Sequence, residues 1–273
     1  MRRLINLRPG AGARLLLGLL PLLALVVVYL GASAARHAEN PRDKLLPTPQ
    51  AMAEAVEMMA FKADPLNGQI PLVVDTAASL KRLGLGLALA TSITLVLGIL
   101  LGLFPYVRAT FGPIVATIAV IPPIAVLPIL FIVMGLGEAS KIALIAVGVA
   151  PFMVRDLANH VAAIPQEQLV KAQSLGAGSW QTLLRLALPQ AMPRLIDCLR
   201  LSLGPAWVFL ISAEAIAADV GLGYRIFLVR RYLSMDVILP YVAWITILAV
   251  IMDLFLLNLS RRAFGWTALE GQR

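Results

Sequence analysis

The sequence has few charged residues, one cysteine and two histidines, and each scarcity excludes a class of protein. Only 14% of its 273 residues are charged, against about 25% in soluble domains. Cys198 has no second cysteine to pair with, so an intrachain disulfide is excluded. His37 and His160 lie far apart, without further ligands at metal-binding spacing. We therefore expect neither a soluble, disulfide-bonded domain nor a metal site.

The sequence also lacks the loop with which ATPases hold phosphate groups. A Walker A loop needs Gly-Lys before Ser or Thr, so that backbone N–H groups can surround the phosphates. None of the five lysines follows a glycine, and the GLGY segment at Gly221–Tyr224 contains only two glycines. Clustered His, Asp or Ser residues at one depth are missing as well. We expect no bound cofactor, no catalytic residues and no enzymatic activity.

What the chain has in abundance is apolar sequence. It is 60% hydrophobic and its mean hydropathy is +0.86, values typical of a helical membrane protein. The net charge of +8 comes from basic residues scattered over loops and span ends. A nucleic-acid-binding surface would need them on one stripe or patch. We therefore expect the lipid bilayer as a partner and no nucleic acid.

The hydropathy pattern predicts an all-α, polytopic membrane protein with about six spans. We expect them at residues 15–35, 83–107, 110–136, 139–160, 199–218 and 237–260, the last five within a domain of residues 73–260. A cleaved signal peptide is the alternative for the first span, but its 21 uncharged residues exceed the usual h-region of about 7–15. Residues 36–72 would form an extracytoplasmic loop with an interfacial helix at Gln50–Phe61.

Arginines gather at both chain ends and set the expected orientation. Residues 1–14 precede the first span and residues 261–273 follow the last, and between them they contain Arg2, Arg3, Arg8, Arg14, Arg261, Arg262 and Arg273. Because basic residues stay on the cytoplasmic side of a membrane, we expect both termini in the cytoplasm.

Several residues within or beside the spans are candidates for a transport path. Three prolines interrupt the third span, and a broken helix is tolerated in a bilayer only beside protein or a water-filled cavity. These prolines predict either a kinked packing helix or a helix that lines a pathway. Glu214 in the fifth span either pairs structurally at the outer end or lines a path or gate, and Asp253 in the sixth could reach the inner interface. The three prolines are Pro122, Pro123 and Pro128, and a basic outer loop contains Arg225, Arg230 and Arg231.

Residues 164–193 are too polar to cross a membrane. A short helix is expected to end at Gly176, since glycine adopts the left-handed conformation that often follows a helix. Ser179 is a good N-cap for a second helix, which Pro189 should stop. The segment therefore predicts a two-helix projection on the cytoplasmic side, with a membrane-surface packing loop as the alternative.

This segment resembles the EAA motif of permease subunits from ABC importers. Ala172 and Gly176 match the motif's second alanine and its glycine, and nine residues then lead to the sequence LALP from Leu186 to Pro189. Val170 and Lys171 stand where the family usually has Glu and Ala. The resemblance implies that the segment docks on an ATPase through Ala172, Ser174, Leu175, Gly176, Ser179, Trp180, Leu186, Leu188 and Pro189.

The resemblance extends from about Leu45 to Trp266. LLPTP, IPPIAVLPILFIVMGLG and AEAIAADVGLGY are similar to segments of the nitrate, taurine and sulfonate permeases. It implies a type-I importer fold in the inner membrane and a homodimeric permease that imports a small anionic solute. The implied partners are a second permease copy, an extracytoplasmic solute-binding protein and two ATPase subunits that hold ATP and Mg.

A secondary transporter that uses Glu214 or Asp253 as a proton carrier is the alternative function. Such transporters usually contain inverted repeats, and the two halves of this sequence show none.

Overall fold

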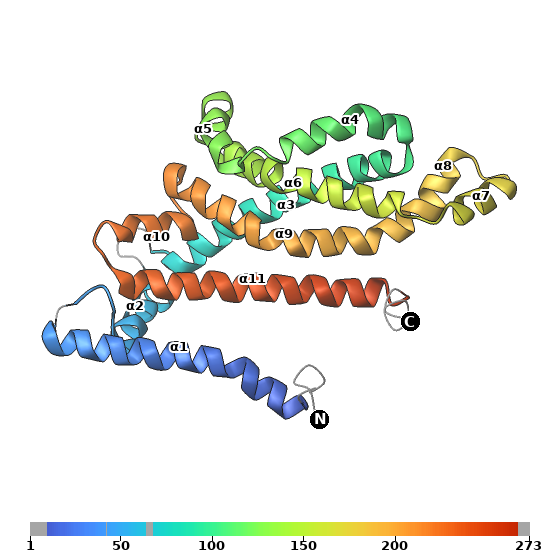
Figure 1. Cartoon of the computed structure of the whole chain (residues 1–273). Helices are drawn as coiled ribbons and strands as arrows, with labels where there is room; N and C mark the ends of the chain where they lie inside the picture. Colours follow the sequence, from blue (N-terminus) through green and yellow to red (C-terminus); the bar gives the residue numbers. More distant parts are fainter. Residues whose placement is uncertain (1–9, 42, 64–67, 267–273) are drawn as a thin grey trace.

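The computed structural model describes residues 10–41, 43–63 and 68–266. That part of the chain is built from helices (Figure 1). The predicted all-α membrane fold is confirmed, because five helices are long and apolar enough to cross a membrane, or six if the bent pair α4 and α5 counts as one span. The helices are α1 (Ala11–Glu39), α2 (Pro49–Phe61), α3 (Pro71–Leu103), α4 (Pro105–Ile118), α5 (Pro123–Met134), α6 (Glu138–Ala162), α7 (Gln166–Ser174), α8 (Ser179–Thr182), the π-helical turn η2 (Leu183–Ala187), α9 (Leu188–Ala217), α10 (Leu222–Arg230) and α11 (Met235–Ala263).

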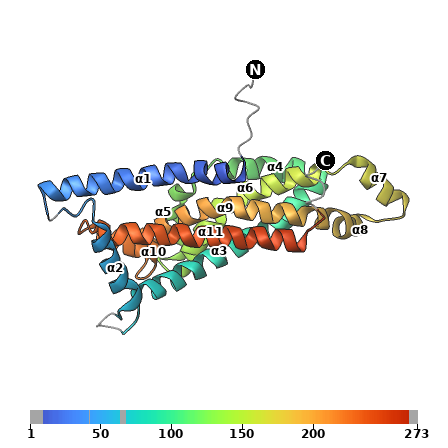
Figure 2. The ribbon, with the colours of Figure 1, turned by 90° about the horizontal axis from the view of Figure 1, so that it is seen from below.

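The bundle has two distinct ends (Figures 1 and 2). Helices α2 and α10 lie at one end, called here the α2–α10 end, and α7 and α8 lie at the other, the α7–α8 end. The beginning of α1 and the end of α11 both point toward the α7–α8 end. Arg2, Arg3, Arg8 and Arg273, which contributed to the predicted orientation, lie outside the described residues.

Helix α1 lies along the side of the bundle, and its side chains form hydrogen bonds with the loop that follows it. None of its most apolar window is buried inside the chain. Tyr29 donates a hydrogen bond to the Pro47 carbonyl at 2.7 Å, and Ser33 donates one to Leu46 at 2.9 Å. In the same loop, the Leu45 N–H and the Arg36 guanidinium hold the pKa of Asp43 below its usual value.

Helix α2 has a clear start and packs across the ends of other helices. Thr48 caps it by accepting a hydrogen bond from the Ala51 N–H at 3.2 Å, and Pro49 occupies the first turn, where no N–H is needed. Ala55 is buried, and the helix lies against α3 and α11. The predicted interfacial helix therefore also packs on the bundle.

Helices α3 and α6 approach closely because small residues of α3 face α6. A Cβ atom added at Gly86 would lie 2.7 Å from the Cβ of Ile145, and one at Gly102 would lie 2.4 Å from Val161. Small residues at such crossings let two membrane helices pack tightly. Helix α3 begins at Pro71, before the predicted start at residue 83, because the polar side chains of its first turns are buried in pairs within the bundle.

The third predicted span is two helices instead of one. Helices α4 and α5 are bent by 94° at a short break, and the break contains Pro122, with Pro123 at the first position of α5. Two consecutive residues without an N–H cannot continue a helical ladder. Pro128 lies inside α5, and only Leu127 of that helix is buried. Residues 110–136 are therefore not one continuous helix, and the break lies at Pro122 and Pro123, two of the prolines that interrupt the predicted span.

Two further boundaries differ from the sequence predictions. Helix α9 begins at Leu188, not at residue 199, because its early charged residues are paired with neighbouring helices. Residues 219–236, predicted as a loop, contain the helix α10. The GLGY segment supplies the N-cap Gly221 and the first turn of α10, and Leu222 and Gly223 are buried.

Candidate functional site

A buried polar cluster joins five helices at the α2–α10 end. Its members come from α3, α6, α9, α10 and α11, and three carboxylates face three cations. We call this set the polar cluster: Asp75, Ser79, Arg82, Glu138, Lys141, Glu214, Arg225 and Tyr241.

Glu214 is fully buried and fully bonded within the chain. Its side chain is 0% exposed, and its carboxylate accepts hydrogen bonds from Ser79 Oγ at 2.8 Å, Arg82 Nη1 at 2.7 Å and the Gly223 N–H at 2.8 Å. A Cβ atom added at Gly221, whose φ is +137°, would lie 2.6 Å from this carboxylate. Within this chain Glu214 therefore makes buried structural contacts with α3 and α10.

The same contacts hold the beginning of α10. Gly221 donates its N–H to Asp75 Oδ1 at 2.9 Å and Leu222 donates to Ser79 Oγ at 2.8 Å, while the next N–H binds Glu214. The first N–H groups of a helix have no partner within the helix, and its N-terminus favours negative charge. Side chains from α3 and α9 thus satisfy three consecutive N–H groups and fix α10 in place.

The residues that surround Glu214 were not predicted from the sequence. They lie between the predicted extracytoplasmic loop of residues 36–72 and the predicted span that begins at residue 83. Asp75, Ser79 and Arg82 nevertheless follow one another at intervals of four and three, the spacing that puts side chains on one face of a helix. That spacing was the available signal.

Arg82 lies between two carboxylates of very different exposure. Its Nη1 binds Glu214 and the Val220 carbonyl, both at 2.7 Å. Its Nε and Nη2 bind the two oxygens of Glu138 at 2.6 and 2.8 Å. Lys141 donates to Glu138 Oε1 at 3.2 Å. The Arg82 and Lys141 side chains are each 4% exposed, whereas Glu138 is 55% exposed.

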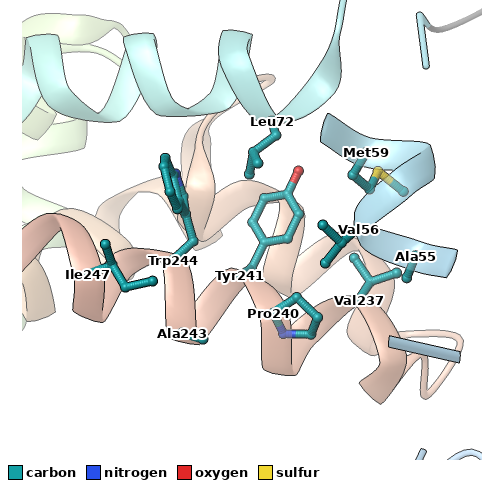
Figure 3. A pocket seen from close by; sticks show the side chains of 10 residues that line it. All are labelled: Ala55, Val56, Met59, Leu72, Val237, Pro240, Tyr241, Ala243, Trp244 and Ile247. Atoms are coloured by element: carbon teal, nitrogen blue, oxygen red, sulfur yellow. The ribbon is translucent and has the colours of Figure 1, made fainter. Parts of the chain in front are cut away.

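Asp75 links the cluster to an apolar pocket. It accepts hydrogen bonds from Arg225 Nε at 2.9 Å and from the Tyr241 hydroxyl at 3.2 Å. The ring of Tyr241 lines a pocket of about 240 Å³ formed by α2, α3 and α11 (Figure 3). Beside it, Trp244 donates its indole N–H to Thr76 at 3.0 Å. The pocket side of Tyr241 is apolar, and its hydroxyl belongs to the polar cluster.

The predicted basic loop is not a uniform patch. Arg225 is bound to Asp75 in the polar cluster, so it is not available as a surface cation. Arg230 and Arg231 are exposed, and the Arg230 guanidinium lies 5.1 Å from the centre of the Phe227 ring. Only the last two arginines remain candidates for attracting an anion.

The predicted docking segment lies at the opposite end, and its glycine behaves as expected. Gly176 has a φ of +83° and donates its N–H to Gln173 at 2.9 Å, while Ala177 donates to the Ala172 carbonyl at 3.0 Å. This pair of bonds is the Schellman arrangement that ends a helix. Ser174, in the last turn, bonds its hydroxyl to the Lys171 carbonyl at 2.9 Å.

The second helix starts one residue before the predicted position. Gly178 is the N-cap with extended backbone angles, and Ser179 is already helical. The cap is completed by Gln181, whose side-chain oxygen accepts the Gly178 N–H at 3.1 Å. The assignment of Ser179 as N-cap is therefore wrong, because the N-cap is Gly178, whose own N–H is bonded by the Gln181 side chain.

Pro189 does not stop the helix. The chain widens into the π-helical turn η2, in which the Leu188 N–H bonds to the Leu183 carbonyl, five residues earlier. Pro189 follows within the first turn of α9 and is exposed, while Leu186 and Leu188 are half-buried. A π-turn absorbs one extra residue, so the helix continues through the proline into the bundle.

Apolar side chains of this segment are exposed. Leu175 is 79% exposed, Trp180 68% and Val170 56%. Further along, Ala187 is fully buried against the bundle. The segment thus projects an apolar surface away from the bundle while its far end is anchored in it.

Ion pairs fix α9 to its neighbours. Arg194 binds both oxygens of Asp156 at 2.6 and 2.7 Å, and the Cys198 thiol donates to the same carboxylate at 2.7 Å. Arg200 binds Asp253 through two bonds at 2.9 and 3.0 Å. Asp253 is therefore paired within the bundle, and the Cys198 thiol is bonded to Asp156.

Comparisons with known proteins give one consistent result. A family model described as binding-protein-dependent transport system inner membrane component matches residues 94–265. The taurine transport system permease protein TauC of Escherichia coli (strain K12) is 38% identical over 222 residues, which cover 81% of this chain and 80% of TauC. The bicarbonate transport system permease protein CmpB of Synechococcus elongatus is 30% identical and covers 68% of each chain.

A solved structure shares the fold. The chain aligns with a structure of the MetNI methionine ABC transporter in an inward-facing conformation, with a TM-score of 0.62 and 23% identity. The alignment covers 70% of this chain and 95% of that one.

Proposed function

The chain belongs to the family of binding-protein-dependent transport system inner membrane components, and from this premise we propose that two copies of it form the import path for a small oxyanion. The chain is a permease subunit of an ABC importer and a multi-pass protein of the inner membrane. It is a transporter subunit without enzymatic activity, and a separate ATPase subunit and a binding protein complete the importer.

The exposed apolar surface of α7 and α8 carries the proposal for coupling. Leu175 and Trp180 lie outside the bundle, where water is a poor environment for them, and an apolar patch rimmed by polar residues suits a protein partner. We assign this surface to contact with the ATPase. Two ATPase subunits, holding ATP and Mg, would meet two such surfaces, one from each permease copy.

This assignment sets the orientation. The α7–α8 end and both termini would face the cytoplasm, in line with Arg261 and Arg262 at the end of α11. The α2–α10 end would then receive the solute from the binding protein, with Arg230 and Arg231 exposed toward it. The bent pair α4 and α5, with its break at Pro122 and Pro123, would line the path between the two copies.

The substrate class rests on the relatives. TauC is named for taurine, a sulfonate, and CmpB for bicarbonate. Both ligands present negatively charged oxygens, so we propose a small oxyanion for this chain as well.

Reconstitution tests the proposal. The permease, its ATPase and its binding protein would be placed in vesicles, and uptake of labelled taurine and bicarbonate measured with ATP inside. We expect uptake that needs ATP and both partners, and a complex whose mass contains two permease copies. Uptake driven by a proton gradient without the ATPase, or one permease copy per ATPase pair, would refute it.

A further inference from the structure

Two buried cations at the α2–α10 end share one exposed carboxylate. Arg82 and Lys141 are almost completely buried, yet Glu138, which binds both, is 55% exposed. Among the described residues, Glu138 is the only group that Lys141 bonds. An ammonium group removed from water needs an anion beside it, and here that anion belongs to a side chain that reaches in from the surface.

The geometry of this contact suits an oxyanion. The Nε and Nη2 atoms of Arg82 present a two-pronged edge that binds both oxygens of Glu138. Such an edge binds two oxygens of a carboxylate or phosphate group, and sulfonate and bicarbonate groups also carry two oxygens on one central atom. Lys141 adds a third donor to one of the same oxygens.

The other face of Arg82 is already satisfied. Its Nη1 is held by Glu214 and the Val220 carbonyl, so the guanidinium stays in position whether or not Glu138 is bound. Asp75 likewise neutralises Arg225. Without Glu138, the remaining charges of the polar cluster are three positive and two negative, and the unpaired charge lies at Arg82 and Lys141.

Glu138 is placed where its side chain can move away from Arg82 and Lys141. It is the first residue of α6 and follows the sequence Gly135-Leu136-Gly137, in which Gly135 has a φ of +78°. A Cβ atom at either glycine would contact nothing within 4 Å, so the connection is uncrowded. Among the described residues, Arg82 and Lys141 are the only groups bonded to the Glu138 side chain.

We propose that Arg82 and Lys141 form an oxyanion-binding site of the permease itself, and that Glu138 occupies this site until the transported anion displaces it. The inference rests on the proposed function for its substrate class. The Glu138 carboxylate has a negative charge and presents two oxygens to Arg82, as a sulfonate or bicarbonate group can, and it keeps the buried cations paired when no solute is present.

A binding measurement on the detergent-solubilised permease–ATPase complex tests the site without the binding protein. The probe is radiolabelled ethanesulfonate, a sulfonate with no ammonium group. We expect Glu138→Ala to lower the dissociation constant about tenfold relative to the wild type, because the probe no longer has to displace a charge-assisted pair. Glu138→Gln, which keeps the side-chain shape, should show a smaller gain in the same direction.

Two further variants make the result specific. Glu57→Ala removes another exposed, ion-paired carboxylate and should bind the probe like the wild type. Adding Lys141→Gln to Glu138→Ala should abolish the gain. Unchanged binding in both Glu138 variants, in complexes that still contain the ATPase, would overturn the site. ATP-dependent uptake is measured separately, so the importer assignment can stand while the site fails, or fail while the site stands.

Discussion

Replacing Gly176 tests whether the end of α7 sets the direction of the proposed ATPase-docking helix. The residue has a φ of +83°, and a Cβ atom added there would meet nothing within 4 Å. A larger side chain therefore meets no steric obstacle, and the only cost is the left-handed backbone. For a β-branched residue this cost is about 1–2 kcal/mol, or roughly a 5- to 30-fold loss of the native conformation of the turn.

The variant Gly176→Val should therefore weaken docking without disturbing the bundle. We expect less ATPase to co-purify with the permease, and a lower substrate-stimulated rate of ATP hydrolysis in reconstituted vesicles. The thermal unfolding temperature of the isolated permease should stay within error of the wild type, because the residue is exposed and outside the helices.

Gly176→Asn is the matched control, since asparagine adds a side chain at the same place but tolerates the left-handed region. It should retain most ATPase binding. Equal behaviour of the valine and asparagine variants would refute the argument from backbone conformation. Full docking and full transport by the valine variant would show that the turn does not direct the docking helix.

Three further predictions separate structural from coupling roles. Glu214→Gln leaves the buried Arg82 guanidinium and Gly223 N–H without their anion and should destabilise the permease by about 3–5 kcal/mol. Asp253→Asn should cost about 1 kcal/mol or less, because the Arg200–Asp253 pair is partly exposed. Thermal unfolding of the two purified variants compares these losses, and equal losses would contradict the role of burial. Gly98→Val should lower the unfolding temperature, because a Cβ atom added at Gly98 would lie 2.8 Å from Leu157 of α6. Gly84→Val should not, because a Cβ atom there would meet nothing within 4 Å; similar losses in the two variants would argue against the close approach of α3 and α6. Trp180→Ala should reduce ATPase co-purification at least several-fold, because aromatic residues contribute strongly to protein interfaces. The unfolding temperature of the isolated permease should not change. Unchanged co-purification would show that this side chain is not part of the docking surface.

The sequence predicted the architecture well because it depends on composition and local signals. Twenty or more uncharged residues identify a span regardless of its neighbours, and Gly176 ends its helix through bonds within six residues of chain. Positions that depend on distant residues were not accessible in this way. Glu214 binds Ser79 and Arg82, more than 130 residues earlier, so its structural role could not be separated from a role in a path.

The two wrong predictions for residues 164–193, the N-cap at Ser179 and the helix stop at Pro189, have a different cause. In each case the chain could form either of two local hydrogen-bonding patterns. The sequence offered Ser179 as a cap, but the Gln181 side chain reaches the Gly178 N–H instead. It offered Pro189 as a stop, but a change from α- to π-helical bonding at Leu183–Ala187 accommodates the proline. Such choices depend on small energy differences that residue preferences do not resolve.

The π-helical turn has a mechanical consequence. Because it keeps the helix continuous, Trp180 and Glu214 belong to the same rod, and the α9 part alone is about 45 Å long at 1.5 Å per residue. One end of this helix carries the exposed apolar surface, and at the other end Glu214 accepts a hydrogen bond from the Gly223 N–H of α10. We therefore expect a displacement of Trp180 on ATPase docking to reach the polar cluster through this helix. Restoring α-helical bonding at η2 would rotate the two ends of the helix relative to each other.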